Sequence, residues 1–244
     1  KGVVPPIVTP LTEQETLDGD GLKNMVRYLL EGGVHGIFVL GSTGEYPCLE
    51  DEVKWEAVKV VVEEVNGRVP VLAGVTGVGT KQTLTNLAKA QDQGVDAVVV
   101  SPGYYYPHTQ GELLHHFERI HNQTQVPIMV YNIPSRVRSA LELDTVAQLA
   151  QMDSVIGIKD TSGDFAFFQD LLTMAAEVDN FSVLQGDEAH MGASCLMGAD
   201  GIVPGIGNLD PVRCVQLYEA GVRRDVDRVI RLQRELRSLC VIYR

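Results

Sequence analysis

The chain has 244 residues, 45% of them hydrophobic and 21% charged, which is ordinary for a globular protein with room for one large domain. Its formal net charge of −12 argues against a nucleic-acid or anionic-membrane surface, because either partner requires clustered Lys and Arg. No apolar run reaches the ~18 residues of a membrane span and the start lacks a charged-then-apolar leader, so we expect a cytoplasmic protein.

The four cysteines are widely separated, with no C-x-x-C pair and no histidine at ligand spacing: Cys48, Cys195, Cys214 and Cys240. This pattern argues against a zinc site and favours free thiols in a reducing compartment. The chain lacks an initiator Met and ends at Arg244 inside a helical pattern, which suggests trimmed ends.

Eight short runs rich in Val and Ile follow one another along the chain, at residues 3–8, 36–40, 69–75, 97–100, 126–130, 155–158, 181–184 and 201–203. The runs are continuous rather than alternating, as expected for parallel strands covered on both faces. Each interval holds a stretch with helical period. In residues 51–65, for example, valines lie on one side and charged residues mostly on the other.

Eight strand–helix units predict an α/β protein with a closed (β/α)8 TIM barrel, which typically takes ~200 to 250 residues. An open doubly wound sheet is the alternative, but Val8-Thr9-Pro10 is not the Gly-rich turn that usually follows its first strand. We expect the barrel to span residues 1–220. Residues 221–244 would then begin a C-terminal helical extension that is largely absent.

Catalytic groups of a barrel sit at the C-terminal ends of its strands. The predicted strand ends carry unusual residues: Gly41-Ser42-Thr43-Gly44-Glu45, Ser101-Pro102-Gly103-Tyr104-Tyr105-Tyr106, Tyr131-Asn132, Lys159-Asp160-Thr161, Gln185-Gly186-Asp187 and Val203-Pro204-Gly205.

Lys159 ends the sixth strand, so its stem should lie against the apolar barrel interior. Burial disfavours an ammonium ion and so favours a neutral amine able to attack a carbonyl carbon. The alternative is a structural lysine paired with Asp160 or another carboxylate. Tyr131, at the same rim, could pass a proton or could simply pack in the core.

Other polar candidates have equally simple alternatives. The glycines of residues 41–44 could let backbone amides cradle a carboxylate, or the segment could be an ordinary turn. Residues 104–106 could form an aromatic wall or a subunit contact. Arg136 could bind a substrate carboxylate or form a solvent-exposed salt bridge. Three histidines on a helical stretch are expected at the surface rather than as ligands: His115, His116 and His121.

Three motifs in order resemble the dihydrodipicolinate synthase and N-acetylneuraminate lyase family: Gly41-Ser42-Thr43-Gly44-Glu45, Tyr131-Asn132-Ile133-Pro134-Ser135-Arg136 and Gly157-Ile158-Lys159-Asp160. The resemblance extends over nearly the whole chain. It implies a class I aldolase-type lyase in which Lys159 forms a covalent Schiff base with pyruvate, without a metal or other cofactor. The enamine formed from that adduct would add to a small aldehyde, or the reverse.

The resemblance also implies roles for individual residues. Tyr131 and Ser42 fall where the family places a proton relay, and Thr43 falls at the contact with the pyruvate carboxylate. Tyr104 matches a tyrosine that relatives lend to a neighbouring active site, which implies a homodimer or homotetramer.

The pyruvate pocket would be lined by the backbones of Gly186 and Val203. Arg136 takes the position that binds the second substrate's carboxylate in the synthases.

Departures from the family pattern leave the second substrate open. Ser42 and Asp160 resemble the sugar-acid lyases and 2-oxo-3-deoxy acid aldolases, whereas Arg136 favours 4-hydroxy-tetrahydrodipicolinate synthase acting on aspartate semialdehyde. Val137-Arg138 replaces the Thr-Gly usual in synthases, and Gly103 replaces an aromatic residue of the lysine feedback site. A ligand-binding homologue without turnover is the alternative of another class. A phosphate-binding barrel, suggested by the Gly-rich residues 204–208, is more distant.

Overall fold

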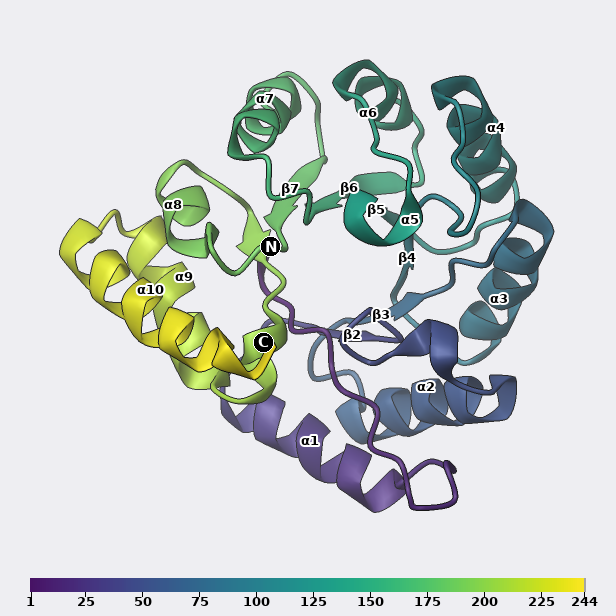
Figure 1. Ribbon diagram of the computed structural model, residues 1–244, viewed down its shortest axis with the longest axis horizontal. Helices are drawn as coiled ribbons and strands as arrows, with labels where there is room; N and C mark the ends of the chain where they lie inside the picture. The colour runs from purple at the N-terminus through teal and green to yellow at the C-terminus, as the bar shows by residue number, and fades with distance from the viewer. Residues whose placement is uncertain (244) are drawn as a thin grey trace.

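The predicted parallel strands are present in the computed structural model, which describes residues 1–243 (Figure 1). Among these residues, eight strands pair in parallel in the order β1-β8-β7-β6-β5-β4-β3-β2. The strands are β1 Gly2–Val3, β2 Ile37–Val39, β3 Val71–Gly74, β4 Ala97–Val100, β5 Ile128–Asn132, β6 Val155–Asp160, β7 Ser182–Gln185 and β8 Gly201–Ile202. The fold prediction is therefore confirmed.

The ring of strands closes between β2 and the segment that follows β1. The Ile7 amide donates to the Phe38 carbonyl at 2.9 Å, and the Phe38 amide donates to the Pro5 carbonyl at 3.0 Å. Pro5 and Pro6 have no amide hydrogen to donate, which limits this pairing to an isolated bridge. These two hydrogen bonds fix the backbone of Phe38 at the point where the barrel closes.

Helices surround the strands (Figure 1). They are α1 Gly19–Glu31, α2 Asp51–Val65, α3 Thr80–Asp92, α4 Gln110–His121, α5 Pro134–Val137, α6 Leu143–Leu149, α7 Phe165–Ala175, α8 Met191–Leu196, α9 Pro211–Val222 and α10 Val226–Leu239, with 3-10 turns at Tyr46–Cys48, Gly205–Asn208 and Cys240–Tyr243. Several helices have a side-chain N-cap. At the start of α1, for example, the Asp18 carboxylate accepts a hydrogen bond from the Gly21 amide at 2.9 Å.

The barrel interior is filled by side chains contributed around the whole ring: Val4, Phe38, Val99, Met129, Tyr131, Leu184 and Val203, with Leu72 partly buried against them. A larger apolar cluster lies between the strands and the helices, as expected for strands covered on both faces. The interior is a packed core, so a substrate must be held at its rim.

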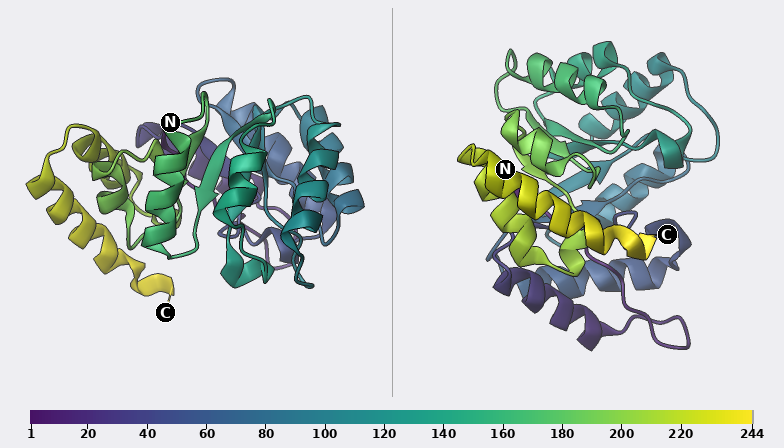
Figure 2. Two further views of the ribbon diagram at one scale, coloured as in Figure 1. Left: turned by 90° about the horizontal axis from the view of Figure 1, so that it is seen from above. Right: turned by 60° about the vertical axis from the view of Figure 1, so that its left-hand side comes forward.

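The last two helices pack on the outside of the barrel, where α10 lies across α8 and α9 and buries Val229, Leu232 and Leu236 (Figure 2). The predicted boundary at residue 220 falls in the last turn of α9, and the division into barrel and extension stays a prediction. No helix within residues 1–243 is long and apolar enough to cross a bilayer.

Candidate active site

Parallel pairing of β5 and β6 brings the two principal candidates together. Tyr131 is the register partner of Lys159, and Asn132 is the partner of Asp160. On the other side of β6, Lys159 lies beside Leu184. Two residues far apart in sequence thus share one level of the barrel rim.

Lys159 is buried, with 5% of its surface exposed. Its Nζ lies 4.1 Å from the centroid of the Tyr131 ring and 5.2 Å from that of Phe38. Within residues 1–243 no carboxylate forms an ion pair with this nitrogen, and the pairing with Asp160 weighed from the sequence does not occur. The amine is surrounded by aromatic and aliphatic carbon.

The Asp160 carboxylate has its own partners. It accepts hydrogen bonds from Asn132 Nδ2 at 2.7 Å and from Ser162 Oγ at 2.9 Å. Burial raises the pKa of this carboxyl above its ordinary value, against the opposing effect of the two hydrogen bonds. The cluster ties the end of β5 to the end of β6, and so fixes Tyr131 relative to Lys159.

Gly186 and Val203 border the lysine stem. A Cβ at Gly186 would lie 2.8 Å from Lys159 Cε and would overlap Thr161 Oγ1, so the lysine stem occupies the space that glycine leaves free. The Val203 amide donates to the Gln185 carbonyl at 2.8 Å. The Val203 side chain lines a very small cavity that Lys159 also borders.

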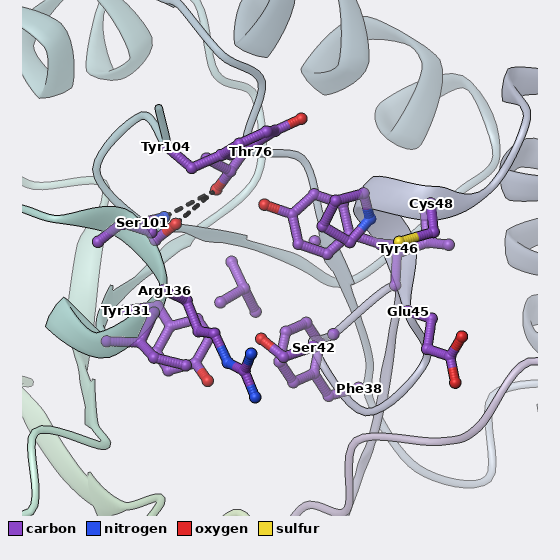
Figure 3. A pocket seen from close by; sticks show the side chains of 17 residues that line it. Phe38, Ser42, Glu45, Tyr46, Cys48, Thr76, Ser101, Tyr104, Tyr131 and Arg136 are labelled. Carbon is purple, nitrogen blue, oxygen red and sulfur yellow. Dashed lines mark hydrogen bonds between the residues drawn. The ribbon is translucent and has the colours of Figure 1, made fainter. Parts of the chain in front are cut away.

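A larger cavity of about 490 Å³ opens above this level, within the range of small-molecule sites (Figure 3). Four of the predicted residues line it: Ser42, Tyr104, Tyr131 and Arg136. Thr43 follows Ser42 but is not among the lining residues. Lys159 does not line this cavity but borders the very small one, and the two spaces share Phe38 and Val99 as lining residues.

The turn after β2 is held by its own backbone. The Gly44 amide donates to the Gly41 carbonyl and the Glu45 amide to the Ser42 carbonyl, both at 3.1 Å. A Cβ at Gly44 would lie 2.8 Å from the Ile7 carbonyl oxygen, so this position requires glycine. Within residues 1–243 the amides of Ser42 and Thr43 donate to no backbone carbonyl.

Hydroxyl groups form one wall of the cavity (Figure 3). The Tyr46 phenol lines the cavity together with Thr76 and Ser101, and Ser101 Oγ donates to Thr76 Oγ1 at 3.2 Å. The Tyr104 ring packs edge-on against Tyr46, with centroids 6.3 Å apart. Burial raises the pKa of both phenols, so at neutral pH they are hydrogen-bond donors rather than bases.

Sequence reasoning missed Phe38, Tyr46 and Thr76. Phe38 is 2% exposed and packs edge-on against Tyr131 with centroids 6.4 Å apart. Its signal was an aromatic residue in an otherwise aliphatic run. The signal for Thr76 was its position directly after the third predicted strand, because residues directly after other predicted strands are candidate site residues.

Arg136 lies on α5, the short helix that follows β5. The side chain is exposed, and Figure 3 shows its guanidinium directed into the cavity. Pro134 opens α5 with a backbone angle suited to the first turn of a helix. A planar cation at this edge can bind a carboxylate of an incoming substrate.

Comparisons with known proteins agree with the geometry. A sequence model described as the dihydrodipicolinate synthetase family matches residues 1–243. The chain is 34% identical to a 4-hydroxy-tetrahydrodipicolinate synthase of Methanothermobacter thermautotrophicus, over 98% of this chain and 85% of that protein. It is 36% identical to the corresponding synthase of Methanopyrus kandleri, over 98% and 80%.

Solved structures show the same fold. The dihydrodipicolinate synthase of Bacteroides thetaiotaomicron superimposes with a TM-score of 0.94 at 35% identity, covering 98% of this chain and 80% of that one. A monomeric dihydrodipicolinate synthase variant gives 0.94 at 29% identity, over 98% and 80%. YagE of E. coli K12, solved in complex with pyruvate, gives 0.94 at 31% identity, over 99% and 82%.

Proposed function

Because the chain belongs to the dihydrodipicolinate synthetase family, we propose that it is a Schiff-base-forming lyase that condenses pyruvate with a small aldehyde such as aspartate semialdehyde. The observation that carries this proposal is the Lys159 amine, buried, free of a carboxylate and 4.1 Å from the Tyr131 ring centroid. An amine kept apart from carboxylates and water is suited to nucleophilic attack on a carbonyl carbon.

The proposed reaction begins when Lys159 Nζ attacks the keto carbon of pyruvate. The C–O bond then breaks, water leaves, and a C=N iminium remains. Loss of a methyl proton gives an enamine, whose carbon attacks the aldehyde. Tyr131 and Ser42, with Tyr104, would pass these protons along the cavity wall that they line.

Binding roles follow from position. Thr43 with the amides of its turn, and the backbones of Gly186 and Val203, would hold pyruvate near Lys159. Arg136 would hold the acidic end of the second substrate. We propose that the chemistry is carried by the lysine adduct and needs no metal or other cofactor.

Access to the amine requires a movement of side chains. Lys159 lies beneath Phe38 and Tyr131, which both line the large cavity. We propose that the lysine stem, resting beside Gly186, turns towards the cavity when pyruvate binds.

Borohydride reduction in the presence of pyruvate tests the proposal. Mass spectrometry should find the reduced pyruvate adduct on Lys159, and Lys159→Ala should abolish it. Lys59→Ala, at an exposed residue near Glu63 on α2, is the matched control and should trap normally. Equal trapping by Lys159→Ala and the native protein would refute the assignment.

A second candidate is cleavage of 2-oxo-3-deoxy sugar acids or of N-acetylneuraminate. It is favoured by the wall of hydroxyls from Tyr46, Thr76 and Ser101, which can bind the hydroxyl groups of a sugar chain. Product formation from pyruvate and aspartate semialdehyde, measured beside pyruvate release from these sugar acids, separates the two. Adduct formation without product from any aldehyde would instead indicate a binding protein.

The assembly is a further part of the proposal. Tyr104 lines the cavity of its own chain here, half-buried against Tyr46. We propose a homodimer or homotetramer, which light scattering can measure, and a cytoplasmic location consistent with four unpaired cysteines.

A further inference from the structure

The loops that follow β7 and β8 are joined beside the candidate active site. Glu188 lies in the first loop, and its carboxylate accepts hydrogen bonds from the amides of Gly205 and Ile206, at 2.9 and 3.3 Å. Gly186 lies two residues before this glutamate, and Val203 lies two residues before Gly205. One carboxylate therefore connects the two backbone segments that would hold pyruvate.

The helix α10, which lies outside the barrel, holds the same loop (Figure 2). Gln233 Nε2 donates to the Glu188 carbonyl oxygen at 2.8 Å, and Gln233 Oε1 accepts from the Gly192 amide at 2.7 Å. Both ends of the side-chain amide are thus used, one on the loop and one on the first turn of α8. A single residue of α10 fixes the loop relative to α8.

Close packing of α8 on α10 makes these contacts possible. A Cβ at Gly192 would lie 2.8 Å from Val229 Cγ1 and 3.1 Å from Gln233 Oε1, so glycine leaves the room that α10 occupies. Val229 is buried in the apolar cluster that joins α8, α9 and α10. Ile206 belongs to the same cluster, so hydrogen bonds and apolar packing hold the two loops at one place.

The loop after β7 reaches Lys159 at its other end. A Cβ at Gly186 would lie 2.8 Å from Lys159 Cε. Only Asp187 separates Gly186 from Glu188, and the Asp187 amide donates to Gln185 Oε1 at 2.8 Å. A displacement of Glu188 would therefore be passed over two residues to the backbone beside the lysine.

We propose that Gln233 and Glu188 are positioning residues of the pyruvate pocket. Gln233 fixes the loop after β7, and Glu188 fixes the loop after β8 relative to it, so that the backbones of Gly186 and Val203 are in place before pyruvate binds. The inference rests on the proposed Schiff-base reaction at Lys159. A site that is ordered before its ligand arrives avoids the cost of ordering it on binding.

Saturation of borohydride trapping by pyruvate tests the proposal. Gln233→Ala should raise the pyruvate concentration for half-maximal trapping at Lys159 by roughly three- to tenfold and leave the maximal trapping rate unchanged, because the pocket is less ordered while the amine is intact. Glu188→Ala should raise this concentration at least as much. Glu188→Gln keeps an oxygen that can accept from both loop amides, so it should restore most of the native affinity for pyruvate.

Two control variants separate positioning from a general loss of stability. Gln216→Ala removes a half-buried glutamine of α9 whose side chain has no hydrogen bond within residues 1–243, and it should saturate as the native protein does. Val61→Ala removes buried methyl groups from α2, on a different side of the barrel (Figure 1), and should lower Tm without changing the saturation by pyruvate.

Either of two results would overturn the proposal: native pyruvate saturation in Gln233→Ala, or a rise in Val61→Ala as large as that in Gln233→Ala. A native protein that formed no pyruvate adduct at Lys159 would instead contradict the proposed lyase function, and this inference with it.

Discussion

Replacement of Gly186 by alanine tests whether the packing of the Lys159 stem governs the proposed reaction with pyruvate. The new Cβ would stand 2.8 Å from Lys159 Cε and 3.1 Å from the Asp160 carbonyl oxygen, and it would overlap Thr161 Oγ1. The lysine stem and the threonine must therefore move. The Asp160 carbonyl oxygen cannot easily move, because it accepts a hydrogen bond from the Gly186 amide at 2.7 Å.

Overpacking of this kind typically costs about 1–3 kcal/mol. For a domain of this size each kcal/mol lowers Tm by roughly 2–4 °C, so we expect a fall of about 2–12 °C. Displacement of a reacting atom by about 1 Å can cost ~100-fold in rate. Because the lysine stem must shift, we expect the rate of pyruvate trapping to fall by roughly 10- to 100-fold.

Calorimetry and timed borohydride trapping at fixed pyruvate measure the two effects. Gly19→Ala is the control, because a Cβ at the first residue of α1 meets nothing within 4 Å. It should keep the native trapping rate. If Gly186→Ala lost stability as expected but trapped pyruvate at the native rate, the packing of the lysine stem beside Gly186 would not govern its reaction with pyruvate.

Three further predictions concern Asp160, Arg136 and His116. Asp160→Ala leaves the Asn132 amide and the Ser162 hydroxyl without their acceptor, so denaturant unfolding should show a loss of about 2–4 kcal/mol. Arg136→Gln should raise KM for an acidic aldehyde and leave pyruvate trapping unchanged; a rise in the pyruvate requirement instead would place Arg136 in the pyruvate pocket. Burial lowers the pKa of His116 to about 4 in the folded protein, whereas a histidine in the unfolded chain keeps its ordinary pKa of about 6.5. As the pH falls below about 6.5, the unfolded chain therefore binds a proton at this residue that the folded chain does not bind. Between about pH 7 and pH 5 the native protein should therefore lose about 2 kcal/mol more stability than His116→Gln, and equal losses in the two proteins would contradict this.

The approach of the two principal candidates could be predicted because parallel strands gather their C-terminal ends on one face. Continuous apolar runs marked β5 and β6, and the residues that ended those runs were Tyr131 and Lys159. Their approach then follows from strand pairing alone. The partners of Asp160 did not follow, because hydrogen-bond geometry at a strand end depends on the turn that comes after it.

His116 shows a signal that was present and overlooked. It lies three residues after Leu113 and four before Ile120, on the face that buries Phe117. Helical spacing therefore places it on the apolar side of α4. General exposure tendencies of histidine were the wrong guide, because the position in the helix decides burial.

Phe38 and Tyr46 were missed for a different reason. In a strand covered on both faces, apolar residues alternate between the barrel interior and the helical shell without a change in polarity, so the inward direction of Phe38 leaves no pattern. Tyr46 lies in a 3-10 turn, whose path depends on the contacts of the surrounding loops.

The two halves of the candidate site therefore depend on different parts of the fold. Lys159, Tyr131 and Gly186 are positioned by strand pairing, whereas Tyr46 and Arg136 stand on the short elements that follow β2 and β5. Loops of a barrel can vary while the strands keep their register. Substitution of Tyr46 should accordingly alter which aldehyde is accepted while pyruvate trapping at Lys159 persists, so the chemistry and the choice of second substrate are separable in this chain.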